Sequence, residues 1–480
     1  MKLSLKQAKL TGILFFILLY AAFYVYKTTK YDLFYYIHDI FSIMIASCGW
    51  MHGHPLWWDN RYGFTPSIHF SFTAPLLSPF IIFGGGKGLF IFHCLAYFLA
   101  FYFVIRTAAD KISFNIKLAV LAVFLFGPYA FWLFDDITYG WHIELALLPL
   151  GVFFACALIS QKKWLIVLCS ALLVFTKEDG IVMACCIHLL YLLSKNQDAK
   201  TNWKKIFLVT AGWITVFLIA LFVIKYFRNF EETRLEAALR EFHEDTKYFN
   251  SSYFTKITWQ FAVMFLPLAG FCYYILNRVD FIKLLLLTLP MIVTGVISGL
   301  WYSGDVRLSV TWAPRFVEIM GVMLAGTVVL LNYQAGENFP NKKTVPAVAI
   351  IATFILQGLA LIAAKDYNIF EEIKKVAQKV LPENITASDA GIIKCISEKT
   401  PHDFNVAVPY EYFSKFDRND FTWFGYYDYA PQKNPDLVIL DDSLKFTEYK
   451  FDYDQYQSEK KGKFYVLVKK DKMLLSKDCN

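Results

Sequence analysis

Long apolar stretches alternate along this chain with short polar connections, and most charged residues lie in the connections. An apolar stretch of about 17–25 residues is long enough to cross the hydrocarbon core of a bilayer as a helix. The pattern predicts a mainly α, polytopic integral membrane protein with about eleven spans. We expect these spans at residues 10–26, 88–106, 117–134, 143–159, 164–176, 179–194, 206–226, 257–276, 281–301, 314–332 and 345–364.

Polar residues are divided unequally between the two sides of these spans. Lysine and arginine gather in alternate connections, which the positive-inside rule assigns to the cytoplasm. The N-terminus is then cytoplasmic, and an odd number of spans places the C-terminus outside. Most other ionisable side chains near membrane depth map to the outer side, namely Asp32, His69, Asp135, Asp136, His142, Glu144, Lys177, Glu178, Asp179, Asp305 and Arg315. Such groups are costly near hydrocarbon and normally face a water-filled cavity, so they predict one polar site on that side.

The same pattern divides the chain into two parts. Residues 1–365 form the predicted transmembrane domain, whereas residues 366–480 are more polar and contain short β-like runs that predict a small extracytoplasmic α/β domain. Within the first part, the long outer segment 27–87 is expected to begin with a helix along the membrane interface. It continues as an irregular loop from His52 to Pro79. A second outer amphipathic helix is expected at 228–256.

Composition agrees with a membrane protein and argues against nucleic-acid binding. Of the 480 residues, 57% are hydrophobic and only 18% are charged, far from the average of soluble proteins. The net charge of +7 is spread over short loops, so nucleic acid is not an expected partner. Cys395 and Cys479 lie in the polar C-terminal part and would be able to pair if that part is outside the cytoplasm.

Asp32 and His69 are the first candidate site residues. Asp32 follows the first span, where a carboxylate could act as a general base on an acceptor hydroxyl or coordinate a cation. The alternative is that it caps an interfacial helix. His69 stands in the run SIHFSFTAPLLSP, where its imidazole could contact a phosphate, a proton or a metal. A hydrogen-bonded packing role is the alternative for this histidine.

Two further groups place charges at span ends. His142 and Glu144 begin one span, and Lys177, Glu178 and Asp179 interrupt an apolar hairpin with three consecutive charges. A simple turn would use Gly, Asn or Ser instead, so these charges are candidates for binding sugar or phosphate. The alternative is a buried pair between Lys177 and a carboxylate that locks the helix ends.

Arg315 and the Asp135-Asp136 pair complete the candidates. Arg315 begins a span and offers a forked set of donors that matches a phosphate. It could equally extend towards the membrane surface or pair with Glu318 on the same helix face. Asp135 and Asp136 could hold Mg²⁺ or Mn²⁺ against a phosphate, although acidic residues are also ordinary in an outer turn. The sequence contains no CxxC or Cys/His zinc spacing and does not require a metal.

Several of these motifs resemble a family of bacterial multi-span membrane proteins of unknown function that is grouped with the GT-C superfamily of glycosyltransferases. The shared features are Asp32 after the first span, HFS at 69–71, His142-Ile-Glu144, Lys177-Glu178-Asp179 and the C-terminal stretch from VLPENITAS to PDLVILDD. The resemblance covers roughly residues 10–442. It implies a GT-C-like bundle with a catalytic outer face, two interfacial helices between the first two spans and a C-terminal soluble domain.

Characterised GT-C enzymes take a sugar from a polyprenyl-phosphate-linked donor and pass it to a lipid, protein or glycan. The resemblance therefore implies a glycosyltransferase of the bacterial cytoplasmic (inner) membrane, with Asp32 as its catalytic carboxylate. On this hypothesis His69, His142, Glu144, Lys177, Glu178, Asp179 and Arg315 contact the sugar or the phosphate, and the acceptor is a lipid or an envelope glycan. The alternative hypothesis is a non-enzymatic binder or transporter of a lipid-linked saccharide.

Overall fold

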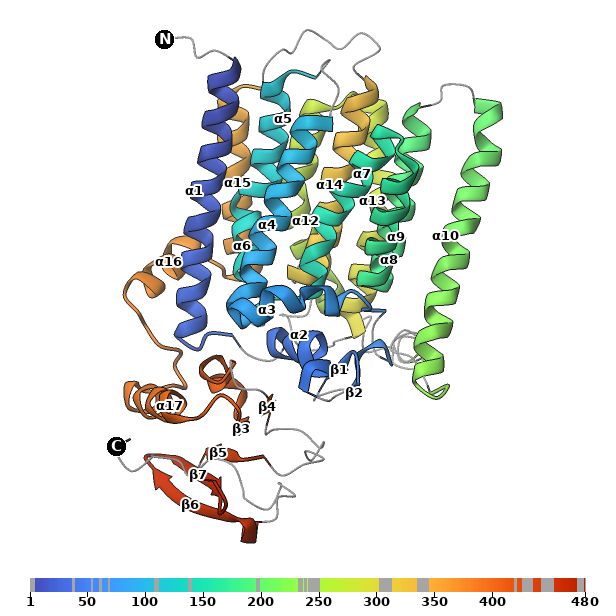
Figure 1. Ribbon diagram of the computed structural model, residues 1–480. Coiled ribbons are helices and arrows are strands. Elements are labelled where there is room, and N and C mark those ends of the chain that lie inside the picture. Colours follow the sequence, from blue (N-terminus) through green and yellow to red (C-terminus); the bar gives the residue numbers. More distant parts are fainter. Residues whose placement is uncertain are drawn as a thin grey trace.

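The computed structural model is a bundle of long helices with a small sheet at one end (Figure 1). It describes residues 5–36, 39–52, 55–59, 63–67, 70–107, 112–136, 140–195, 199–231, 251–301, 313–334, 345–417, 421–424, 435–441 and 453–472, and the single residues 236, 240 and 479. Helix α1 (Leu5–Asp32) begins at the end opposite to the sheet. We refer to the end that carries the sheet as the domain side.

Within the described residues, eight helical segments are long and apolar enough to cross a membrane. They comprise α1, α4 (Gly86–Thr107), the consecutive α5 (Phe114–Leu121), η4 (Ala122–Phe126) and α6 (Pro128–Asp135), the consecutive η5 (Ile143–Ala146) and α7 (Leu147–Ser160), α10 (Ala199–Phe227), α12 (Ser251–Ile275), α14 (Ala313–Gln334) and α15 (Ala347–Lys365). These segments confirm the prediction of a mainly α, multi-pass membrane protein.

Three more helices occupy predicted spans but are not among these eight. They are α8 (Lys163–Thr176), α9 (Glu178–Lys195) and α13 (Arg278–Trp301). With 14 residues, α8 is apolar but short. Its length is about 21 Å at the usual rise per residue, against a hydrocarbon core of about 30 Å. The structure thus supports a polytopic bundle, and the number of eleven spans stays a prediction.

Helix α14 forms the centre of the bundle and α10 its edge. Within its span, 89% of the residues of α14 are buried, and it packs against α7 and α9. By contrast, only 6% of the span in α10 is buried, although this segment has the highest hydropathy of the eight. Figure 1 shows α10 at the margin of the bundle, next to α9. Its apolar surface therefore faces the bilayer along most of its length.

The segment between the first two spans lies on the domain side (Figure 1). Helix α1 continues past its predicted end at residue 26 and has Asp32 as its last residue, so the prediction that Asp32 caps the start of a helix is wrong. The following elements are α2 (Asp39–Cys48), η1 (Gly49–His52), the short antiparallel pair β1 (Trp58–Asp59) and β2 (Gly63–Phe64), η2 (Thr65–Ser67), η3 (Ala74–Leu77) and α3 (Ser78–Gly84). Most of the amphipathic helix expected at 228–256 falls outside the described residues.

The C-terminal part contains the predicted strands in a mixed sheet. Its elements are α16 (Ile369–Ala377), α17 (Ala387–Lys399), β3 (Asn405–Val408), η8 (Tyr410–Lys415), β4 (Phe421–Phe424), β5 (Leu437–Asp441), η10 (Tyr453–Gln455), β6 (Tyr456–Lys461) and β7 (Phe464–Lys469). The strand order is β4-β3-β5-β7-β6, with β3 parallel to β4 and β5, and with β7 antiparallel to β5 and β6. Strands β3, β5 and β7 confirm the β-like runs expected at NVAVPY, DLVIL and KFYVLV, whereas β4, β6 and α16 were not predicted.

This domain is docked on the bundle through the segment around η8. The Asp417 carboxylate accepts hydrogen bonds from the Tyr31 hydroxyl at 2.8 Å and from the Gly86 amide at 3.1 Å. Because Gly86 is the first residue of α4, this carboxylate lies at the positive end of the helix dipole. The rings of Phe41 and Phe413 pack nearby with centroids 4.0 Å apart. The sheet is thus held against the domain side by both polar and apolar contacts.

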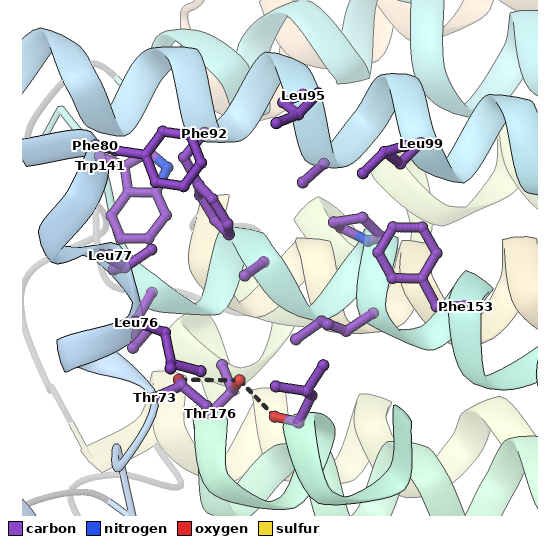
Figure 2. Close-up of a pocket in the computed structure, with 16 residues that line it drawn as sticks. Thr73, Leu76, Leu77, Phe80, Phe92, Leu95, Leu99, Trp141, Phe153 and Thr176 are labelled. Carbon is purple, nitrogen blue, oxygen red and sulfur yellow. Dashed lines mark hydrogen bonds between the residues drawn. The ribbon is translucent and has the colours of Figure 1, made fainter. Parts of the chain in front are cut away.

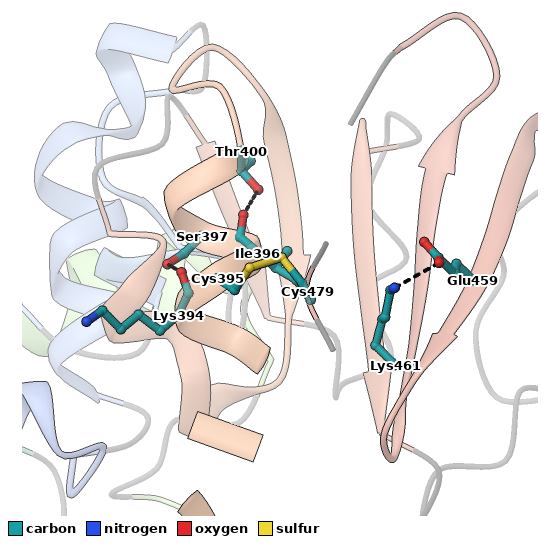
Figure 3. Close-up of a disulfide and its surroundings, with 8 residues drawn as sticks. All are labelled: Lys394, Cys395, Ile396, Ser397, Thr400, Glu459, Lys461 and Cys479. Carbon is teal, nitrogen blue, oxygen red and sulfur yellow. Dashed lines mark hydrogen bonds and ion pairs between the residues drawn. A yellow bond between two sulfur atoms is a disulfide. The ribbon is translucent and has the colours of Figure 1, made fainter. Parts of the chain in front are cut away.

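Cys395 and Cys479 form a disulfide across 84 residues of the C-terminal part (Figure 3). Cys395 belongs to α17, whose start is fixed by a capping box between Thr386 and Asp389. The bond therefore ties this helix to the end of the chain. Disulfides persist mainly in oxidising compartments, so the pair favours a location of the domain outside the cytoplasm.

Replacing both Cys395 and Cys479 with serine is expected to destabilise the C-terminal domain by about 2–4 kcal/mol, because a long loop of the unfolded chain is no longer closed. Thermal unfolding and limited proteolysis of the full-length protein would measure the effect, with Cys185→Ser as a control outside the disulfide. Mass spectrometry after thiol labelling of denatured, non-reduced protein would test the pairing itself. Free thiols at both positions in freshly extracted protein would contradict it.

Candidate functional site

A cluster of charged side chains lies on the domain side of the bundle, where three helix ends meet. Its members come from η5, from the junction of α8 and α9, and from the first turns of α14. We call it the ionic cluster, and it consists of His142, Glu144, Lys177, Glu178, Asp179, Arg315 and Glu318. The two basic residues form ion pairs with Glu144, Asp179 and Glu318.

The junction of α8 and α9 positions three of these residues. Helix α8 ends at Thr176, Lys177 is extended, and α9 begins with two acidic residues, which are favourable at the positive end of a helix. Gly180 allows the two helices to approach closely, since an added Cβ would lie 2.2 Å from the carbonyl oxygen of Leu173. The carbonyl of Phe175 accepts hydrogen bonds from the backbone amides of Phe72 and Thr73. Lys177, Glu178 and Asp179 therefore lie where the chain is held between the end of α8 and the start of α9.

Lys177 is the centre of the ionic cluster. Its side chain is only 1% exposed, and its Nζ lies 2.9 Å from Glu144 Oε1 and 2.9 Å from Asp179 Oδ2. A third carboxylate oxygen, Glu318 Oε1, lies 3.6 Å away. An ammonium group has three protons to donate, so these oxygens account for its capacity. The alternative of a buried pair that locks the helix ends is supported by this geometry.

Arg315 joins α14 to the same network. Its guanidinium pairs with the Asp179 carboxylate and, at 3.4 Å, with Glu318 Oε1 on the next turn of the helix. The predicted pairing with Glu318 is therefore present, and Glu318 itself is fully buried. Among the described residues, the Arg315 Nε–H has no acceptor. Arg315 thus has one buried donor that no described residue satisfies.

His142, Glu144 and Glu178 complete the cluster. His142 Nδ1 lies 3.5 Å from Glu144 Oε2, and both side chains are buried. The carboxylate of Glu178 is close enough to Arg315 to act on it electrostatically. It also accepts a hydrogen bond of 3.1 Å from the backbone amide of Phe70. The segment that carries the HFS motif therefore lies next to the cluster, although His69 itself falls outside the described residues, as does Asp305.

Asp32 is placed differently from these six predicted residues. Its carboxylate is 47% exposed and lies 2.8 Å from Lys87 Nζ and 3.9 Å from Lys415 Nζ. Lys415 belongs to η8 of the C-terminal domain and also donates to the Asp32 backbone carbonyl. Burial lowers the pKa of Lys415, and the neighbouring Asp32 raises it in part. The two described partners of Asp32 are therefore outside the ionic cluster.

A second buried group of charges surrounds Asp135, and its pairing with Lys30 was not predicted from the sequence. Lys30 Nζ lies 3.0 Å from Asp135 Oδ2 and 2.8 Å from Glu372 Oε2 of α16. The Asp135 carboxylate also accepts hydrogen bonds from the hydroxyls of Tyr26, Tyr36 and Tyr367. The nearby Lys27 is fully buried, donates to the Phe134 carbonyl and faces three aromatic rings. These contacts join α1, α6 and α16.

Burial and neighbouring lysines act in opposite directions on Glu372. Burial raises the pKa of its carboxyl group, but Lys30 and then Lys375 lower it, and the net pKa is below its ordinary value. The ionised form is therefore favoured at neutral pH. Two sequence signals were present for this group, namely Asp135, which was interpreted as a possible metal ligand, and the lysines Lys27 and Lys30 directly after an apolar run, which were interpreted as part of the outer segment.

The described residues contain no group of three or more His, Cys, Asp or Glu side chains arranged to hold a metal ion. The oxygens of Asp135, which was considered as a ligand of Mg²⁺ or Mn²⁺, are bonded to Lys30 and to tyrosine hydroxyls. In the ionic cluster the carboxylates of Glu144 and Asp179 face Lys177. Chemically, this site offers carboxylates that can bind hydroxyl groups and one guanidinium donor for an anion.

An apolar cavity of about 310 Å³ adjoins the ionic cluster (Figure 2). Its walls come from η3, α3, α4, Trp141, η5, the first half of α7 and the second half of α8. Thr73 and Thr176 lie at one end, with their hydroxyl oxygens 3.2 Å apart. Thr176 directly precedes Lys177, so this end of the cavity lies next to the junction of α8 and α9.

Comparison with known proteins gives no relative from which a function could be transferred. Neither a protein-family model, nor a curated protein sequence, nor a solved structure matches this chain.

Proposed function

We propose that this chain is an inverting glycosyltransferase of the GT-C type. It takes a sugar from a polyprenyl-phosphate-linked donor and transfers it to a lipid or an envelope glycan at the outer face of a bacterial cytoplasmic membrane. The observation that carries the proposal is the gathering of six predicted site residues in one buried ionic cluster on the domain side. Buried charges within a membrane bundle are costly, and they normally mark a functional cavity.

The proposed topology has eleven spans, a cytoplasmic N-terminus and an extracytoplasmic C-terminal domain. It is supported by the positions of the helices and by the Cys395–Cys479 disulfide, which favours an oxidising compartment. The ionic cluster and Asp32 then face the outer leaflet, where the phosphate of a lipid-linked sugar lies. Donor and acceptor meet outside the cytoplasm.

In the proposed reaction, Asp32 removes the proton from an acceptor hydroxyl. The hydroxyl oxygen forms a bond to the anomeric carbon while the bond from that carbon to the phosphate oxygen breaks, and the polyprenyl phosphate leaves with the electron pair. The free Nε–H of Arg315 contacts the phosphate, and Glu144 and Glu178 orient sugar hydroxyls. Lys177 holds the carboxylates in place, since its own protons are already donated.

A non-enzymatic binder or transporter of a lipid-linked saccharide is the second candidate. It is favoured by one observation, namely that the described partners of Asp32 are Lys87 and Lys415, outside the ionic cluster. In that case the cluster recognises the saccharide, and no group of the site performs chemistry. The two candidates differ in whether a covalent product forms.

Mass spectrometry of lipids and envelope glycans from a strain that lacks this protein tests the proposal. We expect one sugar to be missing from the glycans and its polyprenyl-phosphate-linked precursor to accumulate. Complementation with the wild-type chain should restore both, and complementation with Asp32→Asn should restore neither. Unchanged glycans would contradict the proposal. Restoration by Asp32→Asn, together with movement of the lipid-linked sugar across liposomes, would favour the binder or transporter.

A further inference from the structure

Glu318 is the most deeply buried carboxylate of the ionic cluster. Its side chain is fully buried and stands on α14, at the centre of the bundle. It shares both of its cations with carboxylates that lie closer to them. Lys177 Nζ is 3.6 Å from Glu318 Oε1, against 2.9 Å from Glu144 Oε1 and from Asp179 Oδ2. Arg315 also contacts Asp179 more closely than it contacts Glu318.

The charges of the cluster balance without Glu318. Lys177 and Arg315 supply two positive charges, and Glu144 and Asp179 supply two negative ones. The half-buried Glu178 adds a further negative charge at the start of α9. An ionised Glu318 would therefore be an excess charge in the interior of the bundle. A buried carboxyl group in this situation normally becomes neutral by keeping its proton.

Glu318 also lies directly beside Asp179. Lys177 Nζ and Arg315 Nη1 each contact both Asp179 Oδ2 and Glu318 Oε1, and the two carboxyl groups are close enough to hydrogen-bond to each other. Two carboxylates at such a separation do not both ionise, because a proton between them replaces repulsion with a hydrogen bond. Glu318 Oε2 is buried without a hydrogen-bond partner among the described residues, which suits a neutral acid better than a carboxylate.

The other elements packed against α14 pair no further lysine or arginine with Glu318 in the described part of the chain. Helix α7 has no charged residue, and Asp135 of α6 belongs to the second buried group of charges. The charges of α13 lie in its first two turns, where Lys283 contacts the end of α9 that is opposite to the cluster. His142, the titratable group before η5, lies against Glu144.

We propose that Glu318 holds a proton at neutral pH and donates it in a hydrogen bond to the Asp179 carboxylate. The ionic cluster is thus a proton-binding site on the domain side of the bundle. This inference rests on the contacts within the cluster and is independent of the proposed sugar transfer. Loss of the proton places a second negative charge against the Arg315 guanidinium, so the cluster then attracts an anion less strongly.

Infrared spectroscopy of the full-length protein, in a detergent without carbonyl groups, tests the proposal directly. A protonated carboxyl group has a carbonyl band that is separate from the bands of a carboxylate. We expect such a band in the wild type at neutral pH and its absence from Glu318→Gln. In wild-type protein the band should shift when the glutamate side chains carry a heavy carbon isotope in the carboxyl group.

Glu144→Gln is the matched comparison for Glu318→Gln. Both substitutions replace a buried carboxyl group near Lys177 with its amide. Glu318→Gln should change the melting temperature by less than about 2 °C, because a neutral hydrogen-bond donor takes the place of a neutral acid. Glu144→Gln removes an ionised partner of Lys177 and should lower the melting temperature by about 5 °C or more.

A proton on Glu318 also makes anion binding depend on pH, a consequence that rests on the proposed contact between Arg315 and a phosphate. Sulfate is a suitable probe because its charge is the same at neutral and alkaline pH. We expect sulfate to raise the melting temperature of the wild type more at neutral pH than at the pH where the infrared band is lost. In Glu318→Gln the effect of sulfate should be equal at both pH values.

Identical carbonyl bands in the wild type and in Glu318→Gln would overturn the proposal. A band that shifts only with labelled aspartate would also overturn it, since the proton would then belong to an aspartate such as Asp179. Because labelling uses the wild-type chain, this result does not depend on the folding of a variant. Failure of the proposed function is a separate result, in which glycans are unchanged in the deletion strain while the band of Glu318 is present.

Discussion

Replacing Lys177 with methionine is expected to lower the free energy of unfolding by about 3–5 kcal/mol, because it leaves Glu144 and Asp179 buried without their shared cation. The methionine side chain fills most of the space of the lysine stem, so the loss is mainly electrostatic. Thermal unfolding of the purified protein in detergent would measure it. Lys162→Met removes an exposed lysine from the opposite end of α8 and should change stability by less than about 1 kcal/mol.

A second variant keeps this prediction testable if Lys177→Met accumulates poorly. Lys177→Met combined with Asp179→Asn removes one negative charge together with the positive one, and should recover part of the lost stability. The coupling energy from the two single variants and the double variant isolates the interaction. If Lys177→Met is as stable as the wild type, the ammonium does not hold the ionic cluster together.

Asp32→Asn is expected to reduce sugar transfer by about 10²–10⁴-fold while donor binding stays within twofold of the wild type, because the amide cannot accept the acceptor's proton. Since Asp32 is 47% exposed, the substitution should leave the fold intact. The measurement is transfer from a purified polyprenyl-linked sugar to an extracted acceptor fraction. The donor is the one that accumulates in the deletion strain.

Two other carboxylate variants serve as comparisons for Asp32→Asn. Glu371→Gln changes an acid on α16 that is 57% exposed and outside the proposed site, and its transfer rate should be normal. Glu178→Gln changes the acid that contacts the Phe70 amide, and should weaken donor binding more than the chemical step. Full transfer by Asp32→Asn together with loss of transfer by Glu178→Gln would indicate that the general base lies in the ionic cluster and is not Asp32.

The positions of the helices could be predicted because apolarity and length alone determine which segments enter a bilayer. The shared location of Glu144, Lys177 and Arg315 on one side followed from the same pattern, since spans alternate in direction. The ion-pair partners of these residues were harder to predict from the sequence. The pair of Arg315 and Glu318 was foreseen from its spacing of three residues. A carboxylate partner for Lys177 was also foreseen, but the sequence did not identify Glu144 as one of the two.

Contacts between distant segments could not be predicted. Lys415 is 383 residues from the Asp32 carbonyl that it contacts, and no local pattern links the two. The position of Asp32 was misjudged for a related reason. Helix α1 continues through Lys27 and Lys30 because Asp135, Glu372 and aromatic rings accept their charges, whereas the sequence alone suggested that charged residues end the span.

The contact between Lys30 and Glu372 has a consequence for biosynthesis. The first span leaves the ribosome long before its acidic partner on α16, which is 342 residues further along the chain. During that interval Asp135, directly after the third predicted span, is the described acidic partner that can neutralise the lysine. The anchoring of the first helix is therefore completed late in synthesis, and a chain truncated before residue 372 would leave this helix incompletely anchored.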